Sequence, residues 1–376
     1  MDNINEVTEK LKNVISTSYN ITLMDYIGIM ISIIIFTMLF FYFYTKLNLN
    51  DVNCSNMNYE YKNNAPLTNI DFSSNIYGYK LRDYFIKTAY NACCAGEFKN
   101  DYVNICSLKN CIKQGARCLD FEIYSLDNEP VIAASSIENI TIKETYNIVE
   151  FSNAMDIINN YAFSGGMSPC PNDPLLIHLR IMSNNKQIYD KMATVLQEKL
   201  GKRLLNSKYS YERVDVSNEA LSSFKDKIII IVDKSNPTYL DTKLKEYVNI
   251  SSNSESMRKL RFSYGIKFAN DISELKEYNK RHMTIVLPDV GPTSSNYSIA
   301  VAKKYGCQLI AMCFQNYDIN MIMYEKNFND IGRAFELKNE ELRYTEVKIP
   351  IPDKPNEKVS YKTRIIETPG GLTFTT

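Results

Sequence analysis

Residues 118–124 read Cys-Leu-Asp-Phe-Glu-Ile-Tyr, and this short run is the most informative in the chain. Apolar residues alternate with Asp120 and Glu122, which is typical of a β-strand, and a two-residue period puts both carboxylates on one face. Two carboxylates that face the same way in a buried strand repel each other and are costly to desolvate, unless a cation lies between them. The strand therefore predicts a site that holds a positive charge. The alternative is that both side chains are solvated at a strand end.

Further apolar runs alternate with helical patterns along the chain. Strand-like runs occur at 130–134, 174–181, 227–233, 284–287 and 308–315, and helical periodicity occurs at 142–162 and 185–205. This alternation predicts an α/β domain with a mainly parallel sheet, beginning near Tyr79. A doubly wound sheet usually has a glycine-rich turn after its first strand, and the sequence has no such turn. We therefore expect a TIM-type (β/α)8 barrel.

A transmembrane segment precedes this domain. Residues 26–44 contain no charged side chain and are long enough to cross a hydrocarbon core of roughly 30 Å, with Asp25 and Lys46 at the two ends. A cleaved signal peptide is the competing interpretation, but its apolar part spans only roughly 7–15 residues and ends at a small-residue cleavage site. We predict a single-pass anchor in a cellular or virion membrane. Lys10, Lys12 and Lys46 leave the side of the membrane open.

Composition excludes some functions. The 376 residues carry 43 basic and 43 acidic side chains, and no long basic block is present. Nucleic acid is therefore not an expected partner, because its phosphates require clustered Lys and Arg. The nine cysteines are odd in number and lack metal-ligand spacing, so their disulfide state stays open.

Several ordered blocks resemble one family. Tyr-Phe-Ile-Lys-Thr-Ala-Tyr-Asn at 84–91, Gly-Ala-Arg-Cys-Leu-Asp-Phe-Glu at 115–122, Glu-Pro-Val-Ile at 129–132 and Asp-Pro-Leu-Leu-Ile-His-Leu-Arg at 173–180 resemble the X region of phosphoinositide-specific phospholipase C. The blocks at 251–256, 294–298 and 306–315 are similar to its Y region. The resemblance implies a TIM-type barrel split into X and Y halves. The chain would be a degenerate, membrane-anchored member, and its Asn-, Ile-, Lys- and Tyr-rich composition would fit a large DNA virus.

The anchor and the resemblance together predict an order of segments. Residues 46–78 are polar and Asn-rich without sustained periodicity, which indicates a tether. The predicted segments are an N-terminal tail at 1–23, a transmembrane helix at 24–45, the tether at 46–78, the X half at 79–205, a linker and connecting strand at 206–250, the Y half at 251–340 and a C-terminal tail at 341–376.

The resemblance implies two catalytic histidines, and both are replaced. The family position before Asn91 is Tyr90, and the position of the general acid falls on Ala134. His178 and His282 are the only histidines in the chain, and neither matches a catalytic position. Alanine cannot transfer a proton, and tyrosine titrates near roughly 10. We therefore expect no intact catalytic residue.

The calcium ligands implied by the resemblance are altered as well. They correspond to Asn91, Asp120, Glu122 and Arg180, of which the first three still offer oxygen atoms. Arg180 cannot ligate calcium and would repel it. We predict that the Arg180 guanidinium replaces the ion by bridging Asp120 and Glu122, although it could instead pair with an acid outside the barrel. No cofactor is expected, and calcium could bind only if Arg180 swung away.

The headgroup-binding positions of the family are depleted. Its phosphate-binding arginine and stacking tyrosine fall on Ile285 and Leu287. Ser252 or Ser254 matches the serine position, and Lys234 is what remains of a lysine pair. A phosphoinositide pocket without Arg and Lys lacks its main source of affinity.

Two functions are consistent with these residues. The first is a catalytically inactive, membrane-anchored pseudo-phosphodiesterase that serves as a binding or structural scaffold, with a phospholipid headgroup or a protein as partner. The second is an active phosphoinositide or glycerophosphodiester phosphodiesterase with relocated catalytic residues. His178 is the candidate for a displaced acid, although a buried structural histidine is the simpler interpretation. The absence of both family histidines favours the first function.

Overall fold

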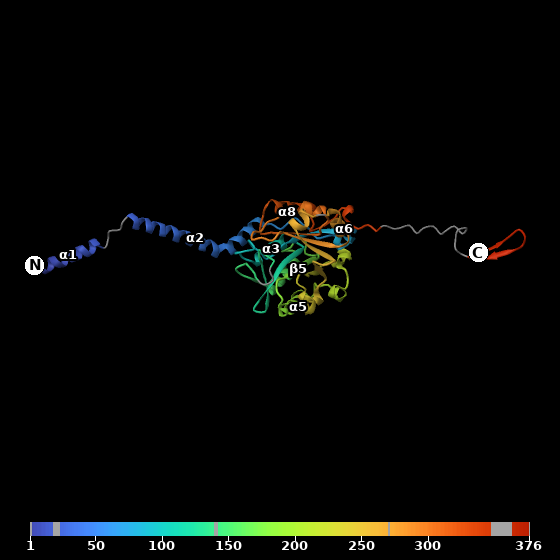
Figure 1. Cartoon of the computed structure of the whole chain (residues 1–376), viewed down its shortest axis with the longest axis horizontal. Helices are drawn as coiled ribbons and strands as arrows, with labels where there is room; N and C mark the ends of the chain where they lie inside the picture. The colour runs from blue at the N-terminus through green and yellow to red at the C-terminus, as the bar shows by residue number, and fades with distance from the viewer. Residues whose placement is uncertain (1, 18–22, 139–141, 270, 347–362, 376) are drawn as a thin grey trace. The chain divides into compact units, whose positions relative to one another are not determined.

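The computed structural model describes residues 2–17, 23–138, 142–269, 271–346 and 363–375 (Figure 1). The chain forms two units, Met1–Arg343 and Tyr344–Thr376, and each is described by itself.

Eight strands of the first unit form the ring of a barrel. They are β1 (Tyr84–Ala89), β2 (Cys118–Leu126), β5 (Leu175–Ile181), β6 (Ile228–Asp233), β7 (Ile250–Ser252), β8 (Met257–Arg261), β9 (Met283–Leu287) and β10 (Leu309–Met312). Each hydrogen-bonded neighbour in the ring is parallel, and β10 returns to pair with β1. The ring is nearly closed between β7 and β8, which the short segment 253–256 joins. The predicted TIM-type barrel is thereby confirmed.

Three short strands extend the sheet outside the ring. Strands β3 (Glu129–Ala133) and β4 (Val149–Glu150) continue from β2 in antiparallel fashion. Strand β11 (Phe335–Leu337) pairs antiparallel with β1. The helix predicted at 142–162 starts only at Phe151, because the backbone before Phe151 makes hydrogen bonds to other segments. The N–H groups of Glu144 and Thr145 donate to the Ala134 carbonyl, and β4 pairs with β3.

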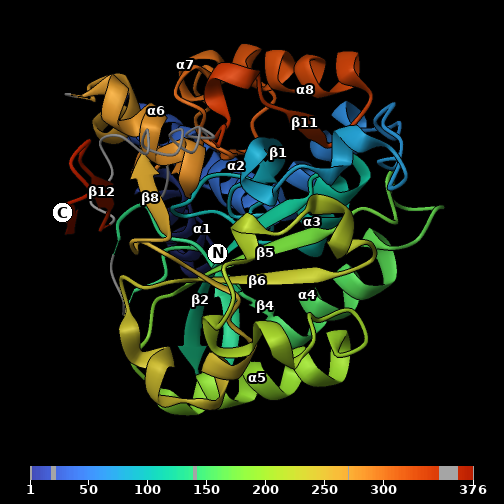
Figure 2. The same ribbon diagram turned by 90° about the vertical axis from the view of Figure 1, so that its right-hand side faces the viewer.

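Helices cover the outside of the ring, and Figure 2 shows α8 and α5 on opposite sides of the strands. They are α3 (Ile105–Lys113), α4 (Phe151–Ile157) with the π-turn η3 (Ile158–Ala162), α5 (Lys186–Leu200), α6 (Ile272–Arg281), α7 (Ile299–Lys304) and α8 (Ile319–Ile331). The shorter turns are η1 (Asn75–Gly78), η2 (Leu81–Asp83), η4 (Ser207–Glu212), η5 (Val216–Asn218), η6 (Leu221–Phe224), η7 (Pro237–Asp241), η8 (Lys243–Tyr247), η9 (Phe262–Lys267) and η10 (Glu340–Leu342).

Helix α5 illustrates why these segments form as they do. The Asn185 side chain caps its first turn by accepting from the Gln187 N–H. Ile188, Met192 and Leu196 recur every fourth residue and are fully buried, so one face of the helix packs on the sheet. Strand β6 is apolar on both faces, as expected for a parallel strand between a barrel interior and a helical layer.

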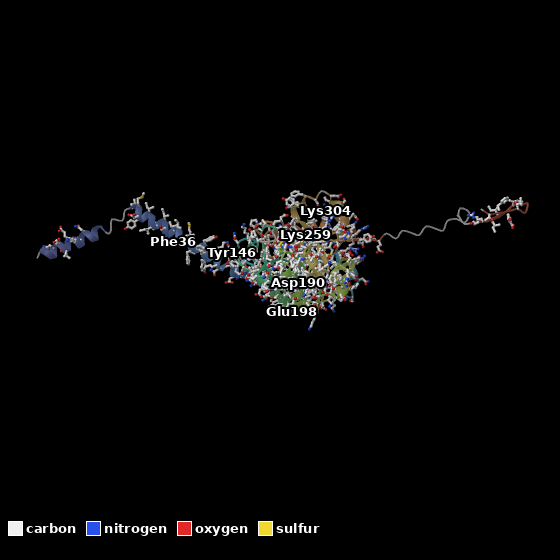
Figure 3. All side chains as sticks on the ribbon, turned by 60° about the horizontal axis from the view of Figure 1, so that its bottom comes forward. Phe36, Tyr146, Asp190, Glu198, Lys259 and Lys304 are labelled. Atoms are coloured by element: carbon white, nitrogen blue, oxygen red, sulfur yellow. A yellow bond between two sulfur atoms is a disulfide. The ribbon has the colours of Figure 1, made fainter. Side chains whose placement is uncertain are left out.

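The N-terminal part consists of α1 (Asp2–Thr17) and α2 (Leu23–Glu60). By length and composition, α2 is the one helix among the described residues that could cross a membrane, a test that a signal sequence can also pass. Its apolar side chains stand out from the helix, as Phe36 does in Figure 3.

The expected tether at 46–78 differs from the structure. Helix α2 continues through its first part to Glu60, and Met57, Tyr61 and Leu67 are buried in the same core as the barrel. A disulfide joins Cys54 to Cys106 of α3. Met57 and Tyr61 are four residues apart, and Leu67 follows six residues later, so the few apolar residues that dock this polar stretch form no long periodic pattern.

The C-terminal unit contains one described hairpin, of β12 (Ile365–Glu367) and β13 (Thr373–Thr375). Gly371 adopts a φ of +79° in its turn, which favours glycine. Residues 347–362 of the predicted tail lie outside the described residues.

Candidate functional site

The carboxyl ends of the ring strands meet at one end of the barrel, which we call the mouth. Strand register places Asp120 beside His178 and Glu122 beside Arg180 on the neighbouring strands β2 and β5. Asn91 reaches the same point from the end of β1. None of these side chains is solvated, because Asp120, His178 and Arg180 are 0% exposed and Glu122 is 3% exposed. The interpretation as solvated strand-end residues is therefore wrong.

Arg180 lies between the two carboxylates, as expected. Its Nε and Nη2 donate to the two oxygens of Asp120 at 2.9 and 2.8 Å, and Nη1 donates to Glu122 at 2.7 Å. Nη2 also donates to the Asn91 side-chain oxygen at 2.8 Å. The guanidinium carbon lies 4.8 Å from the centre of the Tyr90 ring, within range of a cation–π contact.

Both carboxylates are fully hydrogen-bonded. Asp120 also accepts from the Asn91 N–H at 3.1 Å and from His178 Nδ1 at 2.6 Å. Glu122 accepts from the Asn91 amide at 3.3 Å, the Tyr124 hydroxyl at 2.9 Å and the Ser135 N–H at 3.0 Å. A complete set of donors is what makes two buried negative charges tolerable.

Electrostatics inside the site favour the charged forms. Burial alone would raise the pKa of Asp120, but the Arg180 charge and the hydrogen bonds from His178 and Arg180 outweigh it and hold that pKa well below its ordinary value. Burial acts to lower the pKa of Arg180, yet Asp120, Tyr90 and Glu122 raise it well above its ordinary value. Arg180 is therefore a permanent cation at this position.

These residues do not fit a calcium ion. Calcium needs six to eight oxygen ligands, and the oxygens of Asn91, Asp120 and Glu122 that face the centre already accept from Arg180. The guanidinium occupies the position between the carboxylates and carries the charge that balances them. A bound ion would require the Arg180 side chain to leave.

The two positions expected to have lost catalytic histidines are also buried. Tyr90 is 3% exposed, and its hydroxyl accepts from Arg261 Nη1 at 3.2 Å. Burial raises the pKa of Tyr90 against the opposing effect of Arg180 and Arg261, so its phenol is a poorer acid than a free tyrosine. Ala134 is fully buried just after β3. Neither can exchange a proton with a substrate near neutral pH.

A hydrogen-bonded chain that the sequence did not reveal links the two halves of the barrel. His178 Nδ1 donates to Asp120, and Nε2 lies 2.8 Å from the Ser252 hydroxyl of β7. In the neutral form of His178, Nε2 accepts from that hydroxyl. Ser252 thus lies beside the mouth network, and its role in binding a substrate stays a prediction. The signal available in the sequence was the alternation that puts His178 and Arg180 on one face.

The side chains of the other expected binding residues form no hydrogen bond with Asp120, His178 or Ser252. Ser254 turns back to the Ser251 carbonyl at 2.7 Å, and Lys234 is exposed after β6. Two cations from β8 are found near the mouth instead. Lys259 Nζ lies 2.7 Å from Asp233, and Arg261 pairs with Glu138. Sequence reasoning missed them because the run 257–261 was not recognised as a strand.

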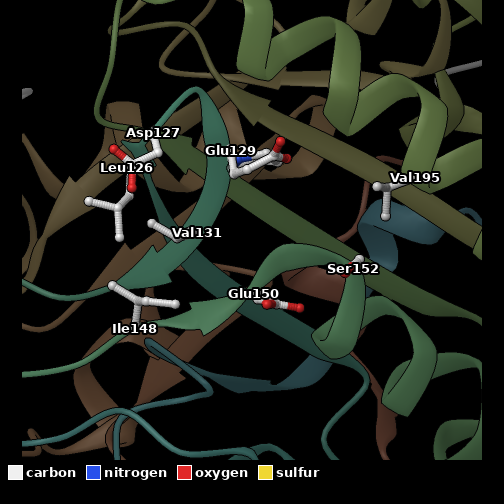
Figure 4. A pocket seen from close by; sticks show the side chains of 9 residues that line it. Leu126, Asp127, Glu129, Val131, Ile148, Glu150, Ser152 and Val195 are labelled. Carbon is white, nitrogen blue, oxygen red and sulfur yellow. The ribbon is translucent and has the colours of Figure 1, made fainter.

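One surface pocket lies away from the mouth, beside the β2–β3–β4 extension (Figure 4). It has a volume of about 340 Å³. Its lining is Leu126, Asp127, Glu129, Pro130, Val131, Ile148, Glu150, Ser152 and Val195. It contains none of the residues of the mouth network.

Two sequence models of known families match the chain. The model described as "Phosphatidylinositol-specific phospholipase C, X domain" matches residues 78–234, and that of the Y domain matches residues 227–340. The Y match begins inside the X match, at strand β6. No curated protein matches the chain.

Solved structures share the fold. The crystal structure of L. pealei PLC21 is similar with a TM-score of 0.61 and 19% identity, covering 74% of this chain and 40% of that chain. For S. officinalis PLC21 the TM-score is 0.60 at 18% identity, covering 77% and 41%. The chain thus spans about two fifths of the length of these proteins.

Proposed function

The chain belongs to the phosphatidylinositol-specific phospholipase C family, and from this we propose that it is a membrane-anchored member without phosphodiesterase activity. Its barrel serves as a binding or structural scaffold at the membrane surface. A phospholipid headgroup or a protein is its partner, and no metal cofactor takes part.

One observation carries the proposal, namely that Arg180 fills the space between Asp120 and Glu122. Four hydrogen bonds fix the guanidinium, and its side chain is fully buried. A charge that is buried, paired and hydrogen-bonded does not move aside without a large cost, since breaking such a pair costs roughly 3–5 kcal/mol. The centre of the mouth is therefore built as a structural core and not as an ion or substrate site.

The chemistry of the surrounding residues supports this conclusion. General acid–base catalysis contributes roughly two to four orders of magnitude per group, and it needs a pKa near the working pH. Tyr90 has its pKa raised by burial, and Ala134 has no titratable group.

One observation favours the second function, an active phosphodiesterase with relocated catalytic residues. It is the row of hydrogen bonds that joins Asp120, His178 and Ser252. A carboxylate that orients a histidine beside a serine hydroxyl is the arrangement that activates a nucleophile in hydrolases. Two features weigh against this use. Ser252 and His178 are both 0% exposed, and the Asp120 carboxylate is already paired with the Arg180 guanidinium. We therefore interpret the chain as a structural link between the X and Y halves.

The test is release of water-soluble inositol phosphate from phosphatidylinositol vesicles by the full-length protein, with and without calcium. We expect no release above a heat-inactivated control. Turnover above the control would overturn the inactive assignment.

If turnover occurs, matched serine variants identify its origin. Loss of turnover in Ser252→Ala, with turnover kept in the neighbouring Ser254→Ala, would establish Asp120, His178 and Ser252 as the catalytic group. Flotation of the full-length protein with liposomes after alkaline extraction tests the anchor separately, and we expect the protein to float.

A further inference from the structure

Two arginines at the end of the barrel opposite the mouth lack the acceptors that buried guanidinium groups normally have. Arg82 directly precedes β1, so it lies at the amino ends of the ring strands. It is only 6% exposed, and its guanidinium forms no hydrogen bond or ion pair with a described residue. Arg343, directly after η10, also has a buried Nε without an acceptor. A guanidinium stays charged at any working pH, so its burial without an acceptor is costly.

Two other buried arginines show what is missing. Arg180 makes four hydrogen bonds at the mouth. Arg117 is fully buried, and it donates with two nitrogens to the Ala162 carbonyl at 3.0 Å and with one of them to the Ser168 hydroxyl. In both cases protein groups satisfy the guanidinium, as is usual for buried polar groups. Arg82 departs from this rule, and a bound anion would supply the acceptor that the protein does not.

A third cation, Lys338, belongs to the same region. Strand β11 runs antiparallel beside β1 (Figure 2), and the Lys338 N–H that follows it donates to the Asp83 carbonyl at 2.9 Å. Lys338 is 1% exposed, and its Nζ donates to the Asn279 carbonyl at 3.0 Å. Burial lowers the pKa of its amine to about 7, with Asp83 opposing the shift and the charge of Arg82 adding to it. The Arg82 and Lys338 charges are therefore close enough to act on each other.

The acid in this region, Asp83, is a weak counter-charge. Its carboxylate accepts the Lys80 N–H at 3.1 Å and forms no ion pair with a described cation. Burial raises the pKa of Asp83, although the nearby cations act to lower it. Arg343 lies 3.6 Å from Glu340, but the Glu340 side chain is 93% exposed, and such a pair contributes little. Positive charge thus remains in excess at this end of the barrel.

We propose that Arg82, Lys338 and Arg343 form a phosphate-binding site, the basal site, at the amino end of the barrel. Guanidinium groups bind phosphate oxygens through paired hydrogen bonds, and two arginines with one lysine supply the charge that balances a dianion. The ligand is a phosphate group, either free inorganic phosphate or a monoester on a small soluble molecule. The basal site shares no residue with the mouth, so the proposal does not depend on whether the mouth is catalytic.

Calorimetric titration of the full-length protein in detergent tests the basal site. Inorganic phosphate is the probe in one arm and glycerol phosphate in the other, with sodium chloride at equal ionic strength as the blank. We expect binding above the chloride blank. Binding of the free ion alone identifies inorganic phosphate as the ligand, whereas binding of the monoester identifies a phosphorylated molecule. No binding in either arm would overturn the proposal.

Arg82→Met separates a binding role from a structural one. We expect the affinity for phosphate to fall at least about tenfold, because charge-assisted hydrogen bonds are lost. The Tm without phosphate should not fall, since the substitution removes a buried charge that has no protein acceptor. A lower Tm together with unchanged affinity would assign Arg82 a structural role and refute the site. Arg343→Met, at a less buried position, should show the same loss of affinity and serves if the first variant does not fold.

Lys234→Met is the matched control, because Lys234 is an exposed cation at the opposite end of the barrel, after β6. We expect its affinity for phosphate to equal that of the wild type. If Lys234→Met weakens binding as much as Arg82→Met does, phosphate binds at the mouth and the basal site is refuted.

Proton uptake gives an independent test of Lys338. An anion beside the Lys338 amine raises its pKa, so binding at about pH 8 should take up protons. Sulfate is the probe, since it does not titrate in this range, and titrations in buffers of different ionisation enthalpy measure the uptake. Lys338→Met should abolish the uptake. Sulfate that fails to bind, or that binds with equal uptake in both proteins, would contradict the role of Lys338.

Discussion

Replacing Arg180 by methionine would leave Asp120 and Glu122 as two buried carboxylates without a counter-charge. Breaking one partner of a buried ion pair costs roughly 3–5 kcal/mol, and four hydrogen bonds are lost with it. In a domain of this size about 1 kcal/mol shifts the Tm by about 2–4 °C. We therefore expect Arg180→Met to lower the Tm by about 6–20 °C near neutral pH.

The pH dependence of this loss follows from the carboxylates. In the wild type the pKa of Asp120 is lower in the folded protein than in the unfolded chain. The carboxylate therefore stabilises the fold at pH values above its pKa in the unfolded chain, and this contribution is lost as the pH falls through its pKa in the folded protein. Without Arg180, burial dominates and raises the folded pKa above the unfolded value of about 3.9. The penalty then grows as the pH rises and is relieved on acidification.

Thermal unfolding of the full chain in detergent, followed by circular dichroism at about pH 8 and about pH 5, measures both effects. Arg258→Met is the matched control, because Arg258 makes a bidentate pair with Glu274 whose side chains are 34% and 51% exposed. Such an exposed pair is worth roughly 0–1 kcal/mol. The reasoning is refuted if Arg180→Met lowers the Tm no more than Arg258→Met, or if its deficit fails to shrink at the lower pH.

Three further outcomes are expected. Arg180→Glu supplies a carboxylate in place of the guanidinium, so added calcium should raise the Tm of this variant while leaving the wild type unchanged; equal shifts in a thermal scan would contradict the account of the site. Replacing both Cys54 and Cys106 by serine opens a loop with a sequence separation of 52. Because the unfolded chain then gains entropy, we expect the free energy of unfolding to fall by about 4 kcal/mol in a denaturant titration. A loss no larger than that caused by one surface serine substitution would show that the disulfide does not constrain the unfolded chain. Gly115→Ala places a Cβ 2.5 Å from the Leu67 side chain at a φ of +75°. We expect this substitution to lower the free energy of unfolding by more than about 1 kcal/mol and therefore to lower the Tm. An unchanged Tm would mean that the segment around Leu67 is not firmly docked.

Local patterns in the sequence identified much of the barrel. The alternation in 118–124 identified β2, and the apolar run at 227–233 identified β6, because side-chain direction in a strand follows from its two-residue period. Strand β8 was missed, since its run of Met-Arg-Lys-Leu-Arg has no continuous apolar face. The segment 46–78 was misjudged for the same reason, as its docking depends on a few apolar residues within a polar stretch.

The sequence by itself determined that Asp120 and Glu122 share a face and that an arginine stands on the corresponding face of a later strand. That no histidine occupies a family catalytic position stays a prediction from the resemblance. Only the tertiary structure decided that Arg180 lies between the carboxylates, that Ser252 meets His178, and that a disulfide joins α2 to α3. The physical reason is that these contacts join residues far apart in the chain. Strand register and barrel closure bring them together, and neither is encoded in the period of any single segment.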